Sequence, residues 1–221
     1  MYSALFRCHK PVECFIFGAG AFAFDVFVEL SYLRHRPRVA CFVQDQAPTS
    51  KLLAGLPVLP FESLTSGLVC ASVAIADPTI RKRVVERLKP LDIKYLTIAA
   101  RGVRLHDSIT VGSGSILCSG VVPTNNIVIG DHVHVNCLST LAHGVRLADF
   151  VTVSPGVVIS GNVHIGEAAF IGTGATIING SLESPLTIGS ESIVAAGAVV
   201  TKPVPPRTMV AGVPAVIKKQ W

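Results

Sequence analysis

Aliphatic residues recur at every sixth position along the C-terminal half of the chain. Thirteen positions from Leu105 to Ile177 fall in this register, and all of them except Pro123 are aliphatic. The residues four places after each are small or aliphatic, and none is charged. A helix of period 3.6 and an ordinary alternating strand would both lose phase with such a pattern. The repeat is typical of a parallel β-helix, in which successive coils stack about 4.8 Å apart.

The register also predicts where the solenoid is interrupted. It holds over the 72 residues between Leu105 and Ile177, which corresponds to four coils if each coil has three hexapeptides. The next aliphatic corner, Ile188, comes eleven residues later instead of six, so five extra residues lie within 179–186. We expect them in an outward loop. The tail from Pro203 abandons the repeat and is expected to fold back as a terminal cap.

The first hundred residues instead alternate apolar runs with helical patterns. Strands are expected at 12–17, 38–43, 68–76 and 94–99, and a helix at 21–33. Asp77 and Pro78 are the cap and first residue of a second helix that runs to Leu88. The proline-rich stretch between the second and third strands is expected to be a loop. Strands alternating with helices predict a small parallel sheet, and hence an α/β domain over 1–100 before an all-β solenoid over 101–221.

Composition and charge narrow the class of partner. The net charge of +5 is spread along the chain, and no basic stretch is interleaved with aromatic residues, so small anionic molecules are favoured over nucleic acid. No apolar run approaches the eighteen or so residues of a membrane span, so no membrane partner is expected. The six cysteines show no CxxC pair and no regular spacing. Neither a zinc ribbon nor a disulfide framework is indicated, and a cytoplasmic location is expected.

One of the seven histidines has a spacing that suggests chemistry. A metal site needs convergent ligands, and no pair of repeat-domain histidines is separated by a multiple of eighteen residues, so no metal is expected. His143 lies two residues after Leu141, and Gly161 follows eighteen residues later, so the two should stack one coil apart. An imidazole beside a backbone N–H can supply the base and the oxyanion donor of acyl transfer. The alternative is a surface histidine without a role.

A glycine turn near the N-terminus suggests a second site. Residues 18–23 (GAGAFA) fit the pattern G-x-G-x-x-G/A between a strand and a helix, where backbone N–H groups can bind a phosphate. The alternative is a tight turn only. Asp45, at the end of the second strand, is placed to bind a ribose hydroxyl or a base edge, or is a solvated turn residue. A single βαβ half favours a mononucleotide group over NAD.

Two long segments resemble a known family. Residues 136–177 and 199–219 (VVTKPVPPRTMVAGVPAVIKK) are similar to the left-handed β-helix acyltransferases. The glycine-turn domain and the helix 77–88 (DPTIRKRVVERL) narrow the resemblance to the bacterial sialic acid O-acetyltransferases and nucleotide-amino-sugar N-acetyltransferases. The resemblance implies a left-handed solenoid, a homotrimer, acetyl-CoA as co-substrate without a metal, and an active site between adjacent subunits.

The resemblance also implies roles for individual residues. His143 matches the catalytic base, and Asn136 matches an asparagine that contacts the acceptor. Gly161 matches the amide that meets the thioester carbonyl. Positions that correspond to the acetyl-CoA site are Thr152, Gly161, Gly172, Thr173 and Ala196. Positions that correspond to the acceptor's nucleotide site are Gly18, Gly20 and Asp45.

Four departures from the family pattern concern the site. Ala142 and Gly144 flank His143, where the family usually has an adjacent acid. Thr152 stands where a second histidine often contacts the donor. The remaining departures are Gly20-Ala21-Phe22 in place of a GGH turn and Gln44-Asp45 in place of paired acids.

The expected function is acetyl-CoA-dependent N-acetylation of a nucleotide-linked amino sugar in surface-polysaccharide synthesis. One alternative is O-acetylation of a sialic acid or of another sugar hydroxyl. The other is a catalytically weak solenoid that binds a nucleotide and serves as a scaffold, because the acid beside His143 is missing.

Overall fold

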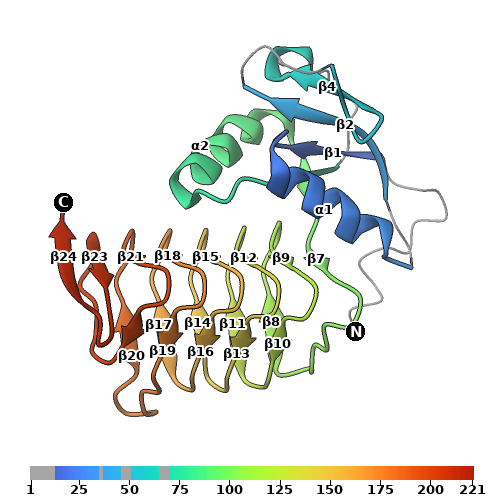
Figure 1. Cartoon of the computed structure of the whole chain (residues 1–221). Helices are drawn as coiled ribbons and strands as arrows, with labels where there is room; N and C mark the ends of the chain where they lie inside the picture. The colour runs from blue at the N-terminus through green and yellow to red at the C-terminus, as the bar shows by residue number, and fades with distance from the viewer. Residues whose placement is uncertain (1–12, 35–36, 46–50, 65–69) are drawn as a thin grey trace. The chain divides into compact units, whose positions relative to one another are not determined.

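The computed structural model describes residues 13–34, 37–45, 51–64 and 70–221, which form two compact units (Figure 1). The first unit extends to Leu96 without Asp77–Thr79, and the second comprises these three residues and Thr97–Trp221. Residues 12, 68 and 69, at the ends of two predicted strands, lie outside the described residues. None of the described helices is long and apolar enough to cross a membrane.

The first unit, in its described part, is a six-stranded sheet with two α-helices. Its strands are β1 (Glu13–Phe17), β2 (Arg38–Gln44), β3 (Leu52–Leu53), β4 (Leu56–Pro60), β5 (Cys70–Val73) and β6 (Lys94–Tyr95). Its helices are α1 (Ala21–Ser31), α2 (Pro78–Leu88) and the short 3-10 helices η2 (Phe61–Ser63) and η3 (Lys89–Leu91). All neighbouring strands are parallel except β3 and β4.

The order of these strands creates a switch point at the centre of the sheet. The order is β3-β4-β2-β1-β5-β6, so the chain runs outward from β1 through β2 and β4 and returns to the other side of β1. Phe15, Ile16 and Phe42 are fully buried, as expected for central parallel strands covered on both faces. Phe27 of α1 contacts Phe42, with ring centroids 5.8 Å apart. Ligands of such sheets bind beyond the carboxyl ends of the strands that flank the switch point.

Two of the predicted elements in this half of the chain are wrong. The stretch expected to be a loop contains β3 and β4, because Val58 pairs with Phe42 and is buried in the sheet. Pro57 and Pro60 lie near the beginning and at the end of β4, where the strand can do without the N–H that proline lacks. The single strand expected at 94–99 is two strands, because Ile98–Ala99 (β7) pairs with β9 of the second unit.

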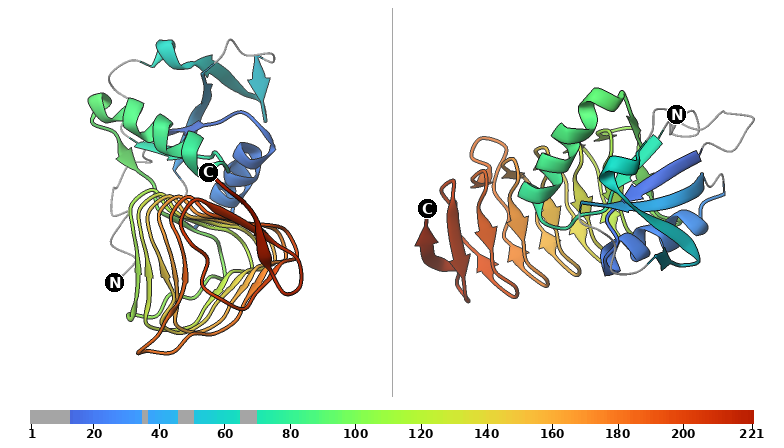
Figure 2. Two further views of the ribbon diagram at one scale, coloured as in Figure 1. Left: turned by 90° about the vertical axis from the view of Figure 1, so that its left-hand side faces the viewer. Right: turned by 90° about the horizontal axis from the view of Figure 1, so that it is seen from above.

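The second unit is a parallel β-helix with three faces, and two views show its stacked coils (Figure 2). The β13 face contains β10 (Val122–Pro123), β13 (Thr140–Leu141), β16 (Val158–Ile159), β19 (Thr176–Ile177) and β22 (Val199–Val200). The β14 face contains β8 (Ile109–Val111), β11 (Ile127–Ile129), β14 (Arg146–Leu147), β17 (Val163–Ile165) and β20 (Leu186–Ile188). The β15 face contains β7, β9 (Ile116–Leu117), β12 (His134–Val135), β15 (Thr152–Val153), β18 (Phe170–Ile171), β21 (Ile193–Val194), β23 (Thr208–Ala211) and β24 (Val216–Gln220).

The pairing register confirms the hexapeptide prediction. Leu141 pairs with Ile159 and Ile159 with Ile177, each eighteen residues on, which is one coil. Ile177 then pairs with Val200, which is five residues further than one coil. The aliphatic residues of the register are buried and form one continuous core along the solenoid. The five extra residues therefore lie where the sequence predicts them, outside that core.

The C-terminal tail ends the solenoid. Strand β23 still pairs in parallel with β21, and β24 turns back antiparallel to β23. This hairpin gives the stack a terminal strand pair in place of a further coil, as terminal caps of solenoids do. The predicted cap is confirmed.

Candidate active site

Three lines of turns run along the edges of the solenoid, and each line contains a different set of residues. We call the turns between the β15 and β13 faces corner 1, those between the β13 and β14 faces corner 2, and those between the β14 and β15 faces corner 3. Because coils stack in register, a residue at a corner has its neighbours eighteen residues before and after it.

His143 and Gly161 are stacked at corner 2, as the sequence predicts. The N–H of Asn162 donates to the carbonyl of His143 across 2.8 Å, which joins the two coils at this point. A Cβ built on Gly161 would lie 2.5 Å from Cε1 of the imidazole, so the ring rests directly on the glycine backbone. Any larger residue at 161 would displace this ring. The side chain of His143 is exposed and can reach a ligand.

Gly161 offers a donor beside this imidazole. Its carbonyl accepts the N–H of Gly180 across 3.0 Å. Its own N–H has no acceptor among the residues that the structure describes. The next coil at this corner carries the inserted loop 179–186, whose Leu182 side chain is 81% exposed. Corner 2 therefore brings together a base, a free amide donor and a loop that starts one coil further on.

The nearest acids in sequence lie at a different corner from His143. Asp131 and Asp149 are at corner 3, where each carboxylate accepts a backbone N–H of the preceding coil. The N–H of Ser113 donates to Asp131 across 2.7 Å, and the N–H of Asp131 donates to Asp149 across 2.8 Å. These carboxylates join coils of the solenoid. They do not orient the imidazole of His143 within one chain.

Apart from Gly161, which is at corner 2, the residues matched to the acetyl-CoA site lie along corner 1 and on β15. A Cβ built on Gly172 would lie 2.5 Å from the amide nitrogen of Ala196, so these two turns stack closely. The N–H of Gly197 donates to the carbonyl of Thr173 across 2.8 Å. Thr152 lies on β15, just before this corner. Asn136 lies at corner 1 two coils before Gly172, and its side-chain amide donates to the carbonyl of Val153 across 2.9 Å.

A single chain does not bring these two sets together. Corner 1 carries Asn136 and Gly172, and corner 2 carries His143 and Gly161. The strands of the β13 face lie between the two corners. A site that uses both sets needs corner 1 of one copy beside corner 2 of another.

In the first unit, the two glycines of the turn differ in what they require. Gly18 has a φ of +125°, and a Cβ there would lie 2.7 Å from the carbonyl oxygen of Ala74, the residue after β5. Gly20 is the N-cap of α1 with a φ of −91°, and a Cβ there would meet nothing within 4 Å. A side chain at Gly20 would therefore not strain the backbone, because its conformation suits any residue. Gly18 is the residue that needs to be glycine.

The carboxylate of Asp45 is engaged at the carboxyl end of β2. It accepts a hydrogen bond from the guanidinium of Arg87 on α2, and the same guanidinium lies 4.1 Å from the centre of the Phe61 ring. A ribose hydroxyl would have to share this pair. A second arginine, Arg81, donates to the carbonyls of Ile75 and Ala76 at 2.6 and 3.2 Å and shapes the turn after β5. Neither arginine stands out in the sequence, because nothing in the helix pattern distinguishes them from the other cations of this segment, although Arg81 is fully buried.

No three histidine, cysteine or acidic side chains in the described part of the chain are grouped so that they could hold a metal ion. The cysteines that the structure describes are free thiols. Cys14, Cys41 and Cys70 lie on neighbouring strands of the first sheet. Burial, reinforced by the other two thiols, raises the pKa of Cys14 to about 12, so this cluster has little thiolate character.

Comparisons with characterised proteins point in one direction. No protein-family model matches the chain. A GDP-perosamine N-acetyltransferase of Escherichia coli O157:H7 is 34% identical over 190 residues, which cover 79% of this chain and 82% of that enzyme. A serine acetyltransferase of Mycobacterium tuberculosis is 32% identical over 117 residues, 51% of this chain and 44% of that protein.

Solved structures match nearly the whole chain. WeeI from Acinetobacter baumannii superposes with a TM-score of 0.84 at 33% identity and covers 93% of this chain and 99% of its own. A perosamine N-acetyltransferase from Caulobacter crescentus, in complex with CoA and GDP-perosamine, has a TM-score of 0.86 at 28% identity, with 96% and 98% covered. The acetyltransferase domain of PglB from Neisseria gonorrhoeae, in complex with acetyl coenzyme A, has a TM-score of 0.82 at 29% identity, with 95% and 100% covered.

Proposed function

This chain belongs to the left-handed β-helix N-acetyltransferases of nucleotide-linked amino sugars, and we propose that it transfers the acetyl group of acetyl-CoA to the amine of such a sugar. The observation that carries the proposal is the contact between His143 and Gly161 at corner 2, because it puts a base and an amide donor side by side. The complexes of relatives with CoA and GDP-perosamine support the two substrates. The product belongs to surface-polysaccharide synthesis, and we place the reaction in the cytoplasm.

In the proposed mechanism the sugar amine attacks the carbonyl carbon of the thioester. His143 accepts the proton that the amine loses, and the N–H of Gly161 donates a hydrogen bond to the developing oxyanion. The carbon–sulfur bond then breaks and CoA leaves as a thiolate, which takes up the proton from the imidazole. Because Ala142 and Gly144 flank His143 and no acid pairs with it among the described residues of one chain, the contribution of the base is expected near the lower end of the usual 10²- to 10⁴-fold.

We propose that the enzyme is a homotrimer with a site at each subunit boundary. The residues matched to the base and to the donor lie on opposite edges of the β13 face, so neighbouring copies are needed to complete one site. The β13 face carries Val122 and Val158, which are 54% and 43% exposed. The row on this face alternates valine and threonine, and such uncharged side chains on a flat face suit contact with other copies of the chain. The complete site then combines Asn136, Gly172, Thr173, Ala196 and Thr152 of one copy with His143 and Gly161 of the next.

We assign the acceptor's nucleotide to the first domain, residues 1–100, as a Rossmann-like half, and acyl transfer to residues 101–221. The support is the switch point between β1 and β5, with Gly18 and Gly20 at the carboxyl end of β1 and Asp45 at that of β2. Backbone N–H groups of the glycine turn bind a phosphate at the start of α1. Asp45 contacts the nucleoside while it shares Arg87.

A thiol-release assay tests this function. The full-length protein is mixed with acetyl-CoA and nucleotide-linked amino sugars, free amino sugars or a sialic acid. We expect CoA release with a nucleotide-linked amine and turnover about 10²-fold lower for His143→Ala. Release with the sialic acid alone would establish O-acetylation instead. No release with any acceptor, together with intact nucleotide binding, would favour a scaffold, and a monomer in sedimentation would rule out the shared site.

A further inference from the structure

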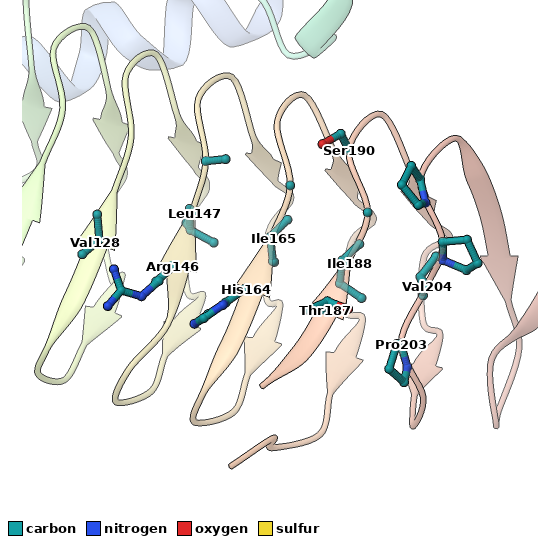
Figure 3. A pocket seen from close by; sticks show the side chains of 15 residues that line it. Val128, Arg146, Leu147, His164, Ile165, Thr187, Ile188, Ser190, Pro203 and Val204 are labelled. Carbon is teal, nitrogen blue, oxygen red and sulfur yellow. The ribbon is translucent and has the colours of Figure 1, made fainter. Parts of the chain in front are cut away.

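A groove crosses the β14 face of the second unit, which lies between corner 2 and corner 3. In-register pairing of β11, β14, β17 and β20 places Val128, Arg146, His164 and Thr187 in one row, about 4.8 Å apart (Figure 3). The row leads toward Pro203–Pro206, the segment that follows β22 (Figure 3). The cavity between them has a volume of about 670 Å³, within the range of small-molecule sites.

Arg146 and His164 are neighbours in this row and have unused hydrogen-bond donors. Neither side chain forms an ion pair or hydrogen bond with another residue in the parts of the chain that the structure describes. Burial, and then the positive charge of Arg146, lower the pKa of His164. An anion bound between the two side chains would offset the repulsion from Arg146 and would favour the charged imidazole. The row is therefore suited to a negatively charged group.

The other residues that line the groove indicate which chemical groups the ligand contains besides the anion. Pro203, Pro205 and Pro206 are exposed and present an apolar surface at one end of the groove. The hydroxyls of Thr187 and Ser190 lie between that end and the cations (Figure 3). The planar guanidinium of arginine matches two oxygens of a phosphate. A ring or an aliphatic group can pack on the prolines while the phosphate meets Arg146. A nucleoside phosphate has both parts.

The groove begins on the coils that hold the reaction pair. Arg146 follows His143 by three residues, and His164 follows Gly161 by three residues. We infer that this groove binds the phosphate-bearing end of a substrate, with Arg146 and His164 holding the phosphate and the segment Pro203–Pro206 contacting the ring. The choice of ligand rests on the proposed function, whose two substrates both carry a nucleoside phosphate: the sugar nucleotide and the adenosine end of CoA.

Isothermal titration of the full-length protein with CoA, GDP and UDP tests this inference. Arg146→Gln removes the guanidinium, and Arg101→Gln, an exposed arginine in a turn outside the groove, removes the same charge as a matched control. We expect Arg146→Gln to weaken one class of ligand about 10-fold or more, as the loss of a charge-assisted phosphate contact should. The ratio of wild-type to His164→Asn affinity for that ligand should be larger at pH 6 than at pH 8, because only the wild type gains a charged imidazole and the ionisation of the ligand's phosphate is common to both proteins.

The outcomes distinguish CoA from the sugar nucleotide as the ligand, and they test the groove separately from the proposed acetyl transfer. A loss confined to CoA identifies the donor, and a loss confined to GDP or UDP identifies the sugar nucleotide. If Arg146→Gln binds all three ligands as the Arg101→Gln control does, the inference is wrong, whether or not the wild type transfers acetyl groups. If the wild type binds a ligand through Arg146 but acetylates no amino sugar, the groove stands and the proposed function fails.

Discussion

Replacing Gly161 with alanine keeps the imidazole of His143 but moves it, and so tests whether its position matters for catalysis. The new Cβ would lie 2.5 Å from Cε1 of His143, while ordinary contact begins at 3.4 Å, so the ring must move by about 1 Å. Because His143 is exposed, the ring can swing outward, and the melting temperature should change little. A displacement of this size costs on the order of 10²-fold in rate for a well-aligned catalytic group. Gly161→Ala should therefore lower turnover about as much as His143→Ala.

The assay is CoA release at saturating acceptor, with kcat and the KM for acetyl-CoA measured for both single variants and for the double variant. We expect kcat to fall about 10²-fold in each single variant while KM for acetyl-CoA stays within a few fold. The double variant should be no slower than His143→Ala, because the two residues act as one unit. Wild-type turnover in Gly161→Ala, or losses that multiply in the double variant, would refute the arrangement proposed here.

Three further predictions concern other parts of the chain. Gly18 has a φ of +125°, and a Cβ there would lie 2.7 Å from a carbonyl oxygen. Gly18→Ala should therefore lower the free energy of unfolding, measured in urea, by about 1–3 kcal/mol, whereas Gly20→Ala should change it little. Exposed Cys137 should react with a thiol reagent at pH 8, whereas Cys14, with a pKa of about 12, should react only after unfolding; equal rates would contradict its burial. Deleting residues 181–185 should keep the melting temperature and change the KM for acetyl-CoA, and a large loss of stability would show that the loop is structural.

The amino-acid pattern alone determines the solenoid. Each coil repeats the same inward positions, so the period of six specifies both the strands and the pairing of Leu141 with Ile159 and Ile177. Local periodicity is sufficient here because the core contacts join residues of the same coil or of neighbouring coils. The same arithmetic located the five extra residues and stacked His143 on Gly161. In the first hundred residues, turn residues and apolar runs agree with each other, and they predicted α1, α2 and the central strands of the first sheet.

The tertiary structure decided everything that depends on which elements become neighbours. The hairpin of β3 and β4 forms because Val58 finds a place beside Phe42, and the prolines in that stretch conceal it in the sequence. The sequence gives no sign that Asp45 has a partner, and the structure shows that it forms an ion pair with Arg87 of α2. The eighteen-residue spacing puts Asp131 beside Asp149 and Arg146 beside His164. Only the structure shows that the two carboxylates accept backbone N–H groups of the preceding coil, and that Pro203–Pro206 line a groove with the two cations. Side chains far apart in sequence acquire partners only when the sheets that carry them are assembled, and a local pattern contains no information on that step.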